Sequence, residues 1–221
     1  MRLPLVLVAL QLVCPVHSSP SLAHLSNLAA EHPIPTTCIA ASFRGAMGDC
    51  LAQAVEGQGS ELDVRRLDKR RLLLYTSFTN LVALVYDRPI YVLLLPRLFP
   101  TFVNGRRVWS NVLKATLLDN FVMTPFLYFP LFYIFKDCIV ERTQPSPLGA
   151  LTHCAAELQH QLLACWAFWV PVTGMSQAFV PVHLRIPFFS VSAVGWIGLL
   201  SARTAALDAR SAASRKQISG G

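Results

Sequence analysis

Residues 113–135 read LKATLLDNFVMTPFLYFPLFYIF, and this stretch decides the fold class of the chain. It carries only two formal charges, Lys114 and Asp119. At 1.5 Å per residue, a helix of this length extends about 35 Å, which is enough to cross a hydrocarbon core of about 30 Å. We therefore predict that residues 113–135 form a membrane-spanning helix.

The composition of the whole chain agrees with a membrane protein. Of its 221 residues, 53% are hydrophobic and only 14% are charged, whereas soluble globular domains average about 25% charged residues. These proportions exclude a typical soluble domain and a disordered chain. Further apolar runs cover residues 33–53, 72–96 and 186–202. We predict an all-α integral membrane helical bundle of about four transmembrane helices.

Residues 162–202 leave two arrangements open, one bent span or two segments. Formal charge is missing from 162–182 and from 186–202, and His183 and Arg185 separate the two runs. We prefer an amphipathic or re-entrant segment through residues 166–181 that leads into a final span at 186–202. The predicted fold is then four spans plus this additional segment.

Small side chains mark one face of the first predicted span. Ala41, Gly45, Gly48 and Ala52 recur at spacings of four, three and four, so one face of a helix carries little side-chain bulk. Membrane helices approach each other closely along such faces. We expect this helix to pack tightly in the bundle.

The two ends of the chain differ from its apolar middle. Residues 1–20 resemble a secretory signal peptide, because Arg2 precedes a short charge-free apolar run, and the pattern leaves cleavage open. An Arg-rich mitochondrial presequence is not expected, since no further Arg occurs before Arg44. The predicted organisation is a leader over 1–20, a membrane domain over 33–201 and a flexible polar tail over 202–221. Positive charges on the predicted loops are too evenly divided to orient the bundle.

The net charge of +7 does not indicate a nucleic-acid partner. The basic residues are scattered between apolar runs, without a groove-reading or RNA-stacking motif. Anionic lipid headgroups are the better counter-charge, so the expected partner is the lipid bilayer. The six cysteines lack CxxC spacing, and we predict no disulfide framework and no zinc site.

The sequence offers little for catalysis. It contains no HExxH, G-x-S-x-G or Walker motif, and no nucleophile stands beside a base. His153, Glu157 and His160 share one helical face, but a wetted helix face explains them better than a metal site. We therefore expect neither a cofactor nor enzymatic activity.

A few polar residues within the apolar runs are the candidate functional residues. A charge near the bilayer centre costs about 2.5–3.5 kcal/mol on insertion scales, so such residues face the bundle interior, pair or line water. Two roles stay open, lining a polar path or pairing helices, and Lys114 with Asp119 is a candidate pair. Thr173 shares its helix face with Ser176 and Gln177. The full candidate set is Asp49, Gln53, Lys114, Asp119, Asn120, Thr173 and Arg185.

Several blocks in order resemble one known family. Pro33 precedes a G-D-x-x-x-Q block at Gly48, Asp49 and Gln53. A D-x-x-R element follows at Asp63 and Arg66. A K-x-x-x-x-D-Q-x-x-x-x-P block then matches Lys114, Asp119, Asn120 and Pro125, with Asn in place of Gln. The closing block matches Trp166, Trp169, Val180, Pro181, His183, Arg185, Trp196, Leu200 and Ser201. Over residues 33–201 the chain resembles the Mpv-seventeen and twenty-two-kilodalton peroxisomal membrane protein family.

The chain also departs from the pattern of this family. A G-P-x-x-H-x-W-Y block is not recognisable around residues 84–91, where Asp87, Arg88 and Pro89 intrude. Thr173 and Ser176 stand where Gln and Asn are usual. The polar lining therefore need not match that of the relatives.

The resemblance implies a multi-pass protein of the mitochondrial inner or peroxisomal membrane. It also implies a weakly selective channel that contributes to membrane permeability and to metabolite and reactive-oxygen balance. Small solutes and a homo-oligomer are further partners to consider. The alternatives are a non-conducting membrane scaffold, and a secretory or other organelle membrane reached through the leader. The residues leave the solute, the organelle and the oligomeric state open.

Overall fold

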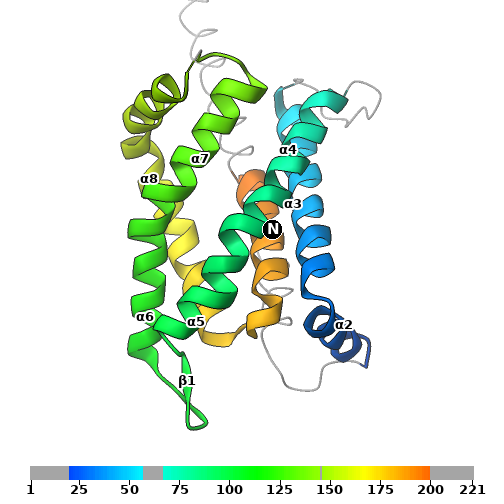
Figure 1. Cartoon of the computed structure of the whole chain (residues 1–221), viewed down its shortest axis with the longest axis vertical. Coiled ribbons are helices and arrows are strands. Elements are labelled where there is room, and N and C mark those ends of the chain that lie inside the picture. Colours follow the sequence, from blue (N-terminus) through cyan, green and yellow to red (C-terminus); the bar gives the residue numbers. More distant parts are fainter. Residues whose placement is uncertain (1–19, 57–66, 145, 200–221) are drawn as a thin grey trace, which may run out of the picture.

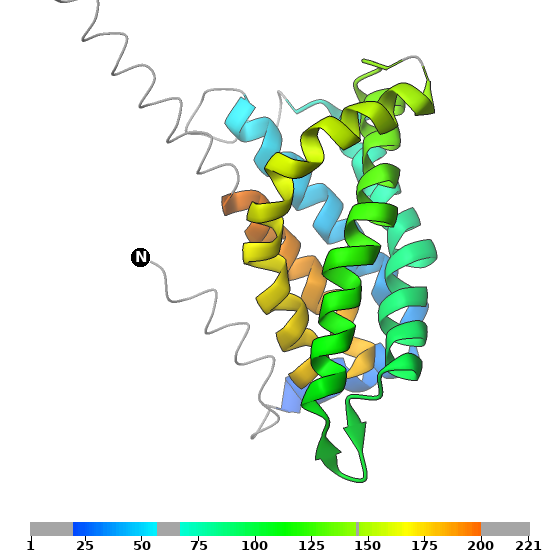
Figure 2. The same cartoon turned by 90° about the vertical axis from the view of Figure 1, so that its left-hand side faces the viewer.

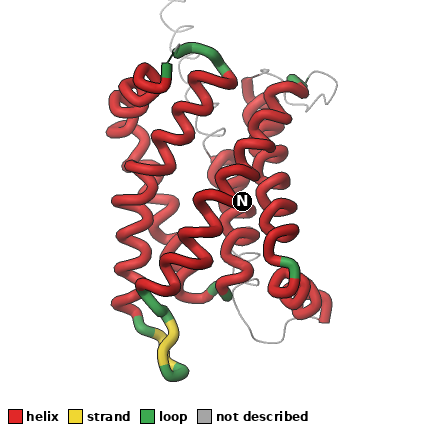
Figure 3. Tube along the Cα trace, viewed as in Figure 1, coloured by secondary structure: helices red, strands yellow, loops and turns green. Residues whose placement is uncertain are grey.

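The computed structural model describes residues 20–56, 67–144 and 146–199, and these residues form an almost entirely helical bundle (Figures 1 and 3). The predicted leader, apart from Pro20, and the predicted tail lie outside the described residues. The all-α membrane bundle predicted from the sequence is confirmed, because four helical stretches are long and apolar enough to cross a membrane. They are Lys69–Leu98, Trp109–Val140, Gln161–Phe179 and Val182–Leu199.

The helices run alternately up and down the bundle (Figures 1 and 2). The first part of the chain forms α2 (Pro20–Glu31), α3 (Pro33–Glu56), α4 (Lys69–Val82), the π-helix η2 (Ala83–Leu94) and α5 (Leu95–Leu98). After the strands β1 (Phe102–Val103) and β2 (Arg106–Arg107) come α6 (Trp109–Leu118), the π-helix η3 (Asp119–Tyr128), α7 (Phe129–Tyr133) and the π-helix η4 (Ile134–Val140). The chain continues through α8 (Pro147–Phe179), the 3-10 helix η5 (Val182–Leu184) and a last helix over 185–199.

The structure resolves the two arrangements left open for residues 162–202. Residues 166–179 are not a re-entrant segment but part of α8, one continuous helix of 33 residues. Val180 leaves the helical conformation (φ −89°, ψ 126°), as expected before Pro181, because a proline disfavours the α conformation of the preceding residue. The described residues therefore form two separate segments rather than one bent span, as preferred, and only the re-entrant character of the first segment is wrong.

The first predicted span is less apolar than the four stretches named above. Helix α3 has 24 residues, which is long enough to cross a membrane, but it is not among the four stretches that meet the apolar criterion. It contains Arg44, Asp49 and many small residues, and it packs alongside α4 (Figure 1).

The small-residue face of α3 lies at two helix contacts, as predicted. A Cβ added to Gly45 would lie 2.8 Å from the Cα of Thr76 in α4. A Cβ on Gly48 would lie 2.6 Å from Cδ1 of Ile197 in the last helix. Glycine at these two positions lets α3 approach both neighbours closely.

Aromatic side chains form much of the interior. The rings of Phe78 and Phe135 stack with centroids 4.1 Å apart, and Tyr91 lies 4.5 Å from Phe189 in the last helix. On the outside, Ile39, Phe126 and Leu163 are each at least 70% exposed. Soluble monomers seldom expose apolar surface on this scale, so this exterior fits contact with lipid chains.

Residues 99–107, which the sequence marks by Pro100, Asn104 and Gly105 as a loop, form a small β-hairpin. Strands β1 and β2 are antiparallel. Asn104 (φ 50°) and Gly105 (φ 74°) both have positive φ, as a type I′ turn requires. The hairpin, α2 and the turn after α8 lie at one end of the bundle, which we call the hairpin end (Figures 1 and 2).

Candidate functional site

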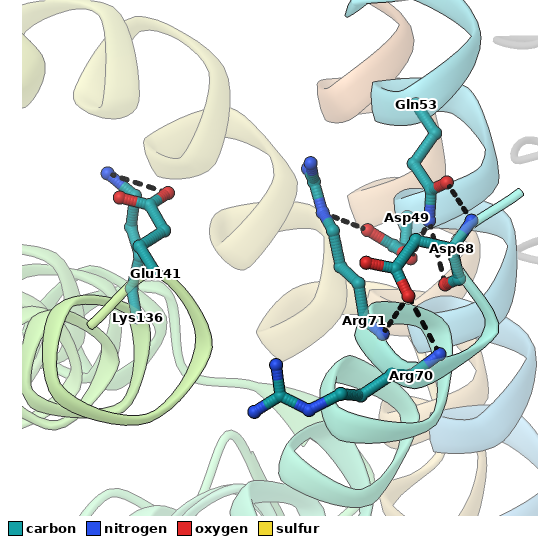
Figure 4. A network of polar contacts seen from close by, with 7 residues as sticks. All are labelled: Asp49, Gln53, Asp68, Arg70, Arg71, Lys136 and Glu141. Atoms are coloured by element: carbon teal, nitrogen blue, oxygen red, sulfur yellow. Dashed lines mark hydrogen bonds and ion pairs between the residues drawn. The ribbon is translucent and has the colours of Figure 1, made fainter. Parts of the chain in front are cut away.

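Asp49 is the centre of a polar network that joins α3 to α4 at the end opposite the hairpin (Figure 4). Its carboxylate is 2.9 Å from Nε of Arg71 and accepts a hydrogen bond of 2.7 Å from Nε2 of Gln53. Gln53 also accepts a hydrogen bond from the backbone N–H of Asp68. Asp68 in turn caps α4 through the backbone N–H groups of Arg70 and Arg71. Asp49 and Gln53, both candidates from the sequence, therefore lie together and connect α3 to the start of α4.

A second ion pair joins α3 to the middle of the stretch Lys69–Leu98. Nη1 of Arg44 lies 2.9 Å from Oδ2 of Asp87. Arg44 also donates to the backbone carbonyl of Thr79. Asp87 is only 5% exposed, and a buried carboxylate of this kind needs its cation, because removing one partner of a buried pair costs about 3–5 kcal/mol.

Asp119 lies at the meeting point of three helices. The hydroxyl of Tyr91 in η2 donates to Oδ1 of Asp119 at 2.8 Å. The hydroxyl of Thr173 in α8 donates to Oδ2 at 3.3 Å. All three residues are at least 92% buried. Asp119 and Thr173, both candidates from the sequence, therefore lie together inside the bundle.

Lys114 does not join this site. Its side chain is exposed, and the predicted pairing with Asp119 is wrong. Five residues along a helix of 3.6 residues per turn correspond to a rotation of about 140°. The two side chains therefore leave the helix on different faces, and the partners of Asp119 come from other helices.

Further buried polar side chains continue the site along α8 and η3. Nδ2 of Asn120 donates to the carbonyl of Thr116, and the carbonyl of Asn120 accepts a hydrogen bond of 2.9 Å from Nε1 of Trp166. The side-chain oxygen of Asn120, the hydroxyl of Ser176 and both polar atoms of Gln177 are buried and have no hydrogen-bond partner within the described chain. We define the polar core as Tyr91, Asp119, Asn120, Thr173, Ser176 and Gln177.

Arg185 lies beside the polar core at the start of the last helix. It is 2% exposed. Its Nη1 donates to the carbonyl of Tyr91 at 3.2 Å, and its Nε donates to the carbonyl of Val180 at 3.5 Å. Val180 is the C-cap of α8, and the C-terminus of a helix carries partial negative charge. Backbone carbonyls therefore compensate this cation.

Of the remaining motif residues, the tryptophans pack between helices, and the prolines lie at the start of, within or before helical segments. Trp196 packs against Phe168 at 5.2 Å, and Trp169 lies 6.4 Å from Phe189. Pro33 begins α3, Pro125 lies within η3 and Pro181 precedes η5.

The sequence did not indicate every important partner. Tyr91 and Arg71 contact Asp119 and Asp49 from helices 28 and 22 residues away in the chain, and a single sequence carries no signal for such pairs. Asp137, which is not among the candidates from the sequence, is fully buried, and its Oδ2 lies 2.6 Å from Nδ1 of His153. Among the described residues, no group of three His, Cys, Asp or Glu side chains could hold a metal ion.

Comparison with known proteins finds similarity to one family of membrane proteins. The model of the Mpv17 / PMP22 family matches residues 153–201. A peroxisomal membrane protein PMP22 of Arabidopsis thaliana is 25% identical over 78% of this chain and 83% of its own length. Proteins named SYM1 from Debaryomyces hansenii and Mycosarcoma maydis are each 26% identical over 80% of this chain and over 84% and 83% of their own lengths.

No solved structure matches the chain significantly. The family match falls on α8 and the last helix, which supply Thr173, Ser176, Gln177 and Arg185. Together with four helices that are long and apolar enough to cross a membrane, these matches confirm the resemblance seen in the sequence: the chain is a multi-pass membrane protein similar to the Mpv17 / PMP22 family.

Proposed function

We propose that the chain forms a weakly selective channel that contributes to the permeability of an organelle membrane, either the peroxisomal or the mitochondrial inner membrane. The observation that carries this proposal is the set of unpaired polar atoms in the polar core, on Asn120, Ser176 and Gln177. An unpaired polar group at membrane depth is costly unless it contacts water or a polar solute. A path for small solutes supplies such contacts, which helix packing alone does not.

The charge of Asp119 within the polar core and that of Arg185 beside it suit weak rather than strong selectivity. Asp119 contacts the hydroxyl of Tyr91, whereas Arg185 contacts the carbonyl of the same residue. A carboxylate and a guanidinium thus lie on the two sides of one tyrosine. Rings of a single sign select for ions of the opposite sign, and a mixed pair favours neither cations nor anions.

Reconstitution tests this function. The full chain, inserted in a planar bilayer, is expected to pass small ions and solutes. Gln177→Leu removes both unpaired polar atoms at similar size, and we expect it to lower the conductance. The matched control is Phe126→Leu, which changes a side chain that is 70% exposed on the outside of the bundle. A silent wild-type protein refutes the channel, and unchanged conductance of Gln177→Leu refutes this lining.

A non-conducting scaffold is the second candidate, and the ion pairs favour it. Two ion pairs connect α3 to the stretch Lys69–Leu98. They are Arg44 with Asp87 and Asp49 with Arg71. In a scaffold the interior polar residues act only between helices. A protein that is folded and stable in the bilayer yet passes no solute, alone or as a homo-oligomer, supports this function. We propose no enzymatic activity for either case.

A further inference from the structure

A pocket lies near the hairpin end, where the start of α3, η2 and the turn before the last helix meet. Its volume is about 200 Å³. Apolar side chains form most of its wall, and Arg88 and His183 are its two titratable residues. The full lining is Pro33, Thr37, Arg88, Val92, Val182, His183 and Ile186.

Arg88 brings a positive charge into this pocket that the described protein does not neutralise. It lies within the stretch Lys69–Leu98, ten residues before the end. The neighbouring carboxylate, Asp87, is already paired with Arg44. Among the described residues, no hydrogen bond or ion pair is made by the Arg88 side chain. A cation at this depth needs an anion, water or the membrane interface.

The other polar groups of the pocket are oriented by the protein. Nε2 of His183 lies 2.9 Å from the hydroxyl of Ser26 in α2. The hydroxyl of Thr37 donates to the carbonyl of Pro33 at 2.8 Å. The guanidinium of Arg88 is therefore the group of the pocket that is free to bind an anion.

The size of the pocket limits what it can hold. Pockets for drug-sized ligands have volumes of about 300–1,000 Å³, so about 200 Å³ accommodates a headgroup-sized fragment but not a whole lipid. A guanidinium matches a phosphate with two parallel hydrogen bonds. The apolar wall formed by Val92, Val182 and Ile186 suits the glycerol and upper acyl carbons that follow the phosphate.

We propose that this pocket binds the headgroup of an anionic phospholipid, with its phosphate on Arg88 and its acyl chains along the outside of the bundle. The site is distinct from the polar core. It also accounts for Arg88, which stands where the family motif of the second span is interrupted and which the channel function does not use. The rival arrangement is an arginine that only extends to the membrane interface and binds no particular lipid.

Lipid binding by the purified full chain tests the proposal. The protein is placed in nanodiscs of phosphatidylcholine with or without phosphatidylglycerol, and bound phosphatidylglycerol is counted by native mass spectrometry. Loss of a charge-assisted contact predicts about ten-fold weaker binding for Arg88→Gln. Arg88→Lys retains the positive charge but cannot form the two parallel hydrogen bonds of a guanidinium, so it should bind with intermediate affinity. The control is Arg106→Gln, which removes an equal charge from an exposed position in the hairpin.

Each outcome decides the proposal. Equal binding by wild type and Arg88→Gln overturns it, as does an equal loss in Arg106→Gln, which would indicate non-specific attraction. If Arg88→Gln does not fold in phosphatidylcholine alone, Val92→Phe is the second variant, because its larger side chain fills the pocket and leaves Arg88 in place. Binding of phosphatidylglycerol by Val92→Phe as tight as by the wild type then overturns the proposal. Inorganic phosphate is the competing probe, and displacement of the lipid at equal concentration would identify a free-phosphate site instead. None of these readouts depends on conductance.

Discussion

Replacing Gly45 with alanine measures how much the bundle depends on the close approach of α3 to α4. The added Cβ would lie 2.8 Å from the Cα of Thr76, and a backbone atom cannot turn away as a side chain can. The same methyl group would press on the hydroxyl of Thr79, which donates to the carbonyl of Ala41 at 2.9 Å. The two helices must therefore separate or shift.

Three effects set the size of the change. Overpacking of a well-packed contact costs about 1–3 kcal/mol. An interhelical hydrogen bond in a membrane protein contributes about 0.6 kcal/mol. Alanine is better than glycine within a helix by about 1 kcal/mol, which offsets part of the loss. We expect Gly45→Ala to lower the free energy of unfolding by about 1–2 kcal/mol.

The assay is reversible unfolding in mixed micelles, followed by far-UV circular dichroism. Gly195→Ala is the matched control, because a Cβ at Gly195 meets nothing within 4 Å. The control should be neutral or more stable than the wild type by up to about 1 kcal/mol. Equal stability of Gly45→Ala and Gly195→Ala would refute the inference that the glycine is needed for close packing.

Two further predictions concern a buried ion pair and a buried thiol. Asp87→Asn should lower the free energy of unfolding by about 3–5 kcal/mol, because Arg44 is left without its anion. Exchanging the two residues, Arg44→Asp with Asp87→Arg, should restore more than half of that loss. A thermodynamic double-mutant cycle that shows no recovery would contradict the ion pair. Burial, and secondarily Asp137, raises the pKa of the Cys154 thiol. A protein retaining Cys154 alone should therefore react with a maleimide more slowly at pH 8 than the single cysteine of an unstructured peptide, and the difference in rate should narrow as the pH rises. Asp137→Asn should speed this reaction, and identical rates at every pH would rule out a raised pKa.

The class of the fold could be predicted because charge-free runs of span length have few alternatives in a chain with so few charges. Residues 113–135 indicate a span by length and composition alone, and they lie within the helical stretch Trp109–Val140. The break after α8 was harder to place. Its signal, Pro181, was present in the sequence, but the apolar runs on both sides also allow one bent helix.

The candidate site was predicted only in part. Thr173, Ser176 and Gln177 share a helix face, so their common burial follows from helical spacing. The contacts of Asp119 follow from tertiary packing, which a local pattern does not encode, and Lys114 was wrongly paired with it for that reason. Asn104 and Gly105 carry a hairpin signal in the sequence, because an Asn-Gly pair is typical of a type I′ turn.

The π-helix η2 changes the spacing of the buried residues along the stretch Lys69–Leu98. Within α4, η2 and α5, the buried residues include Phe78, Val82, Tyr86, Ile90 and Leu95, with steps of four, four, four and five residues. An ideal α-helix would return to the same face after 3.6 residues on average. A helical wheel drawn with 100° per residue therefore rotates the inward stripe gradually toward lipid. The interior face of this stretch is better traced by following every fourth to fifth residue, a spacing that keeps these five side chains on the buried side.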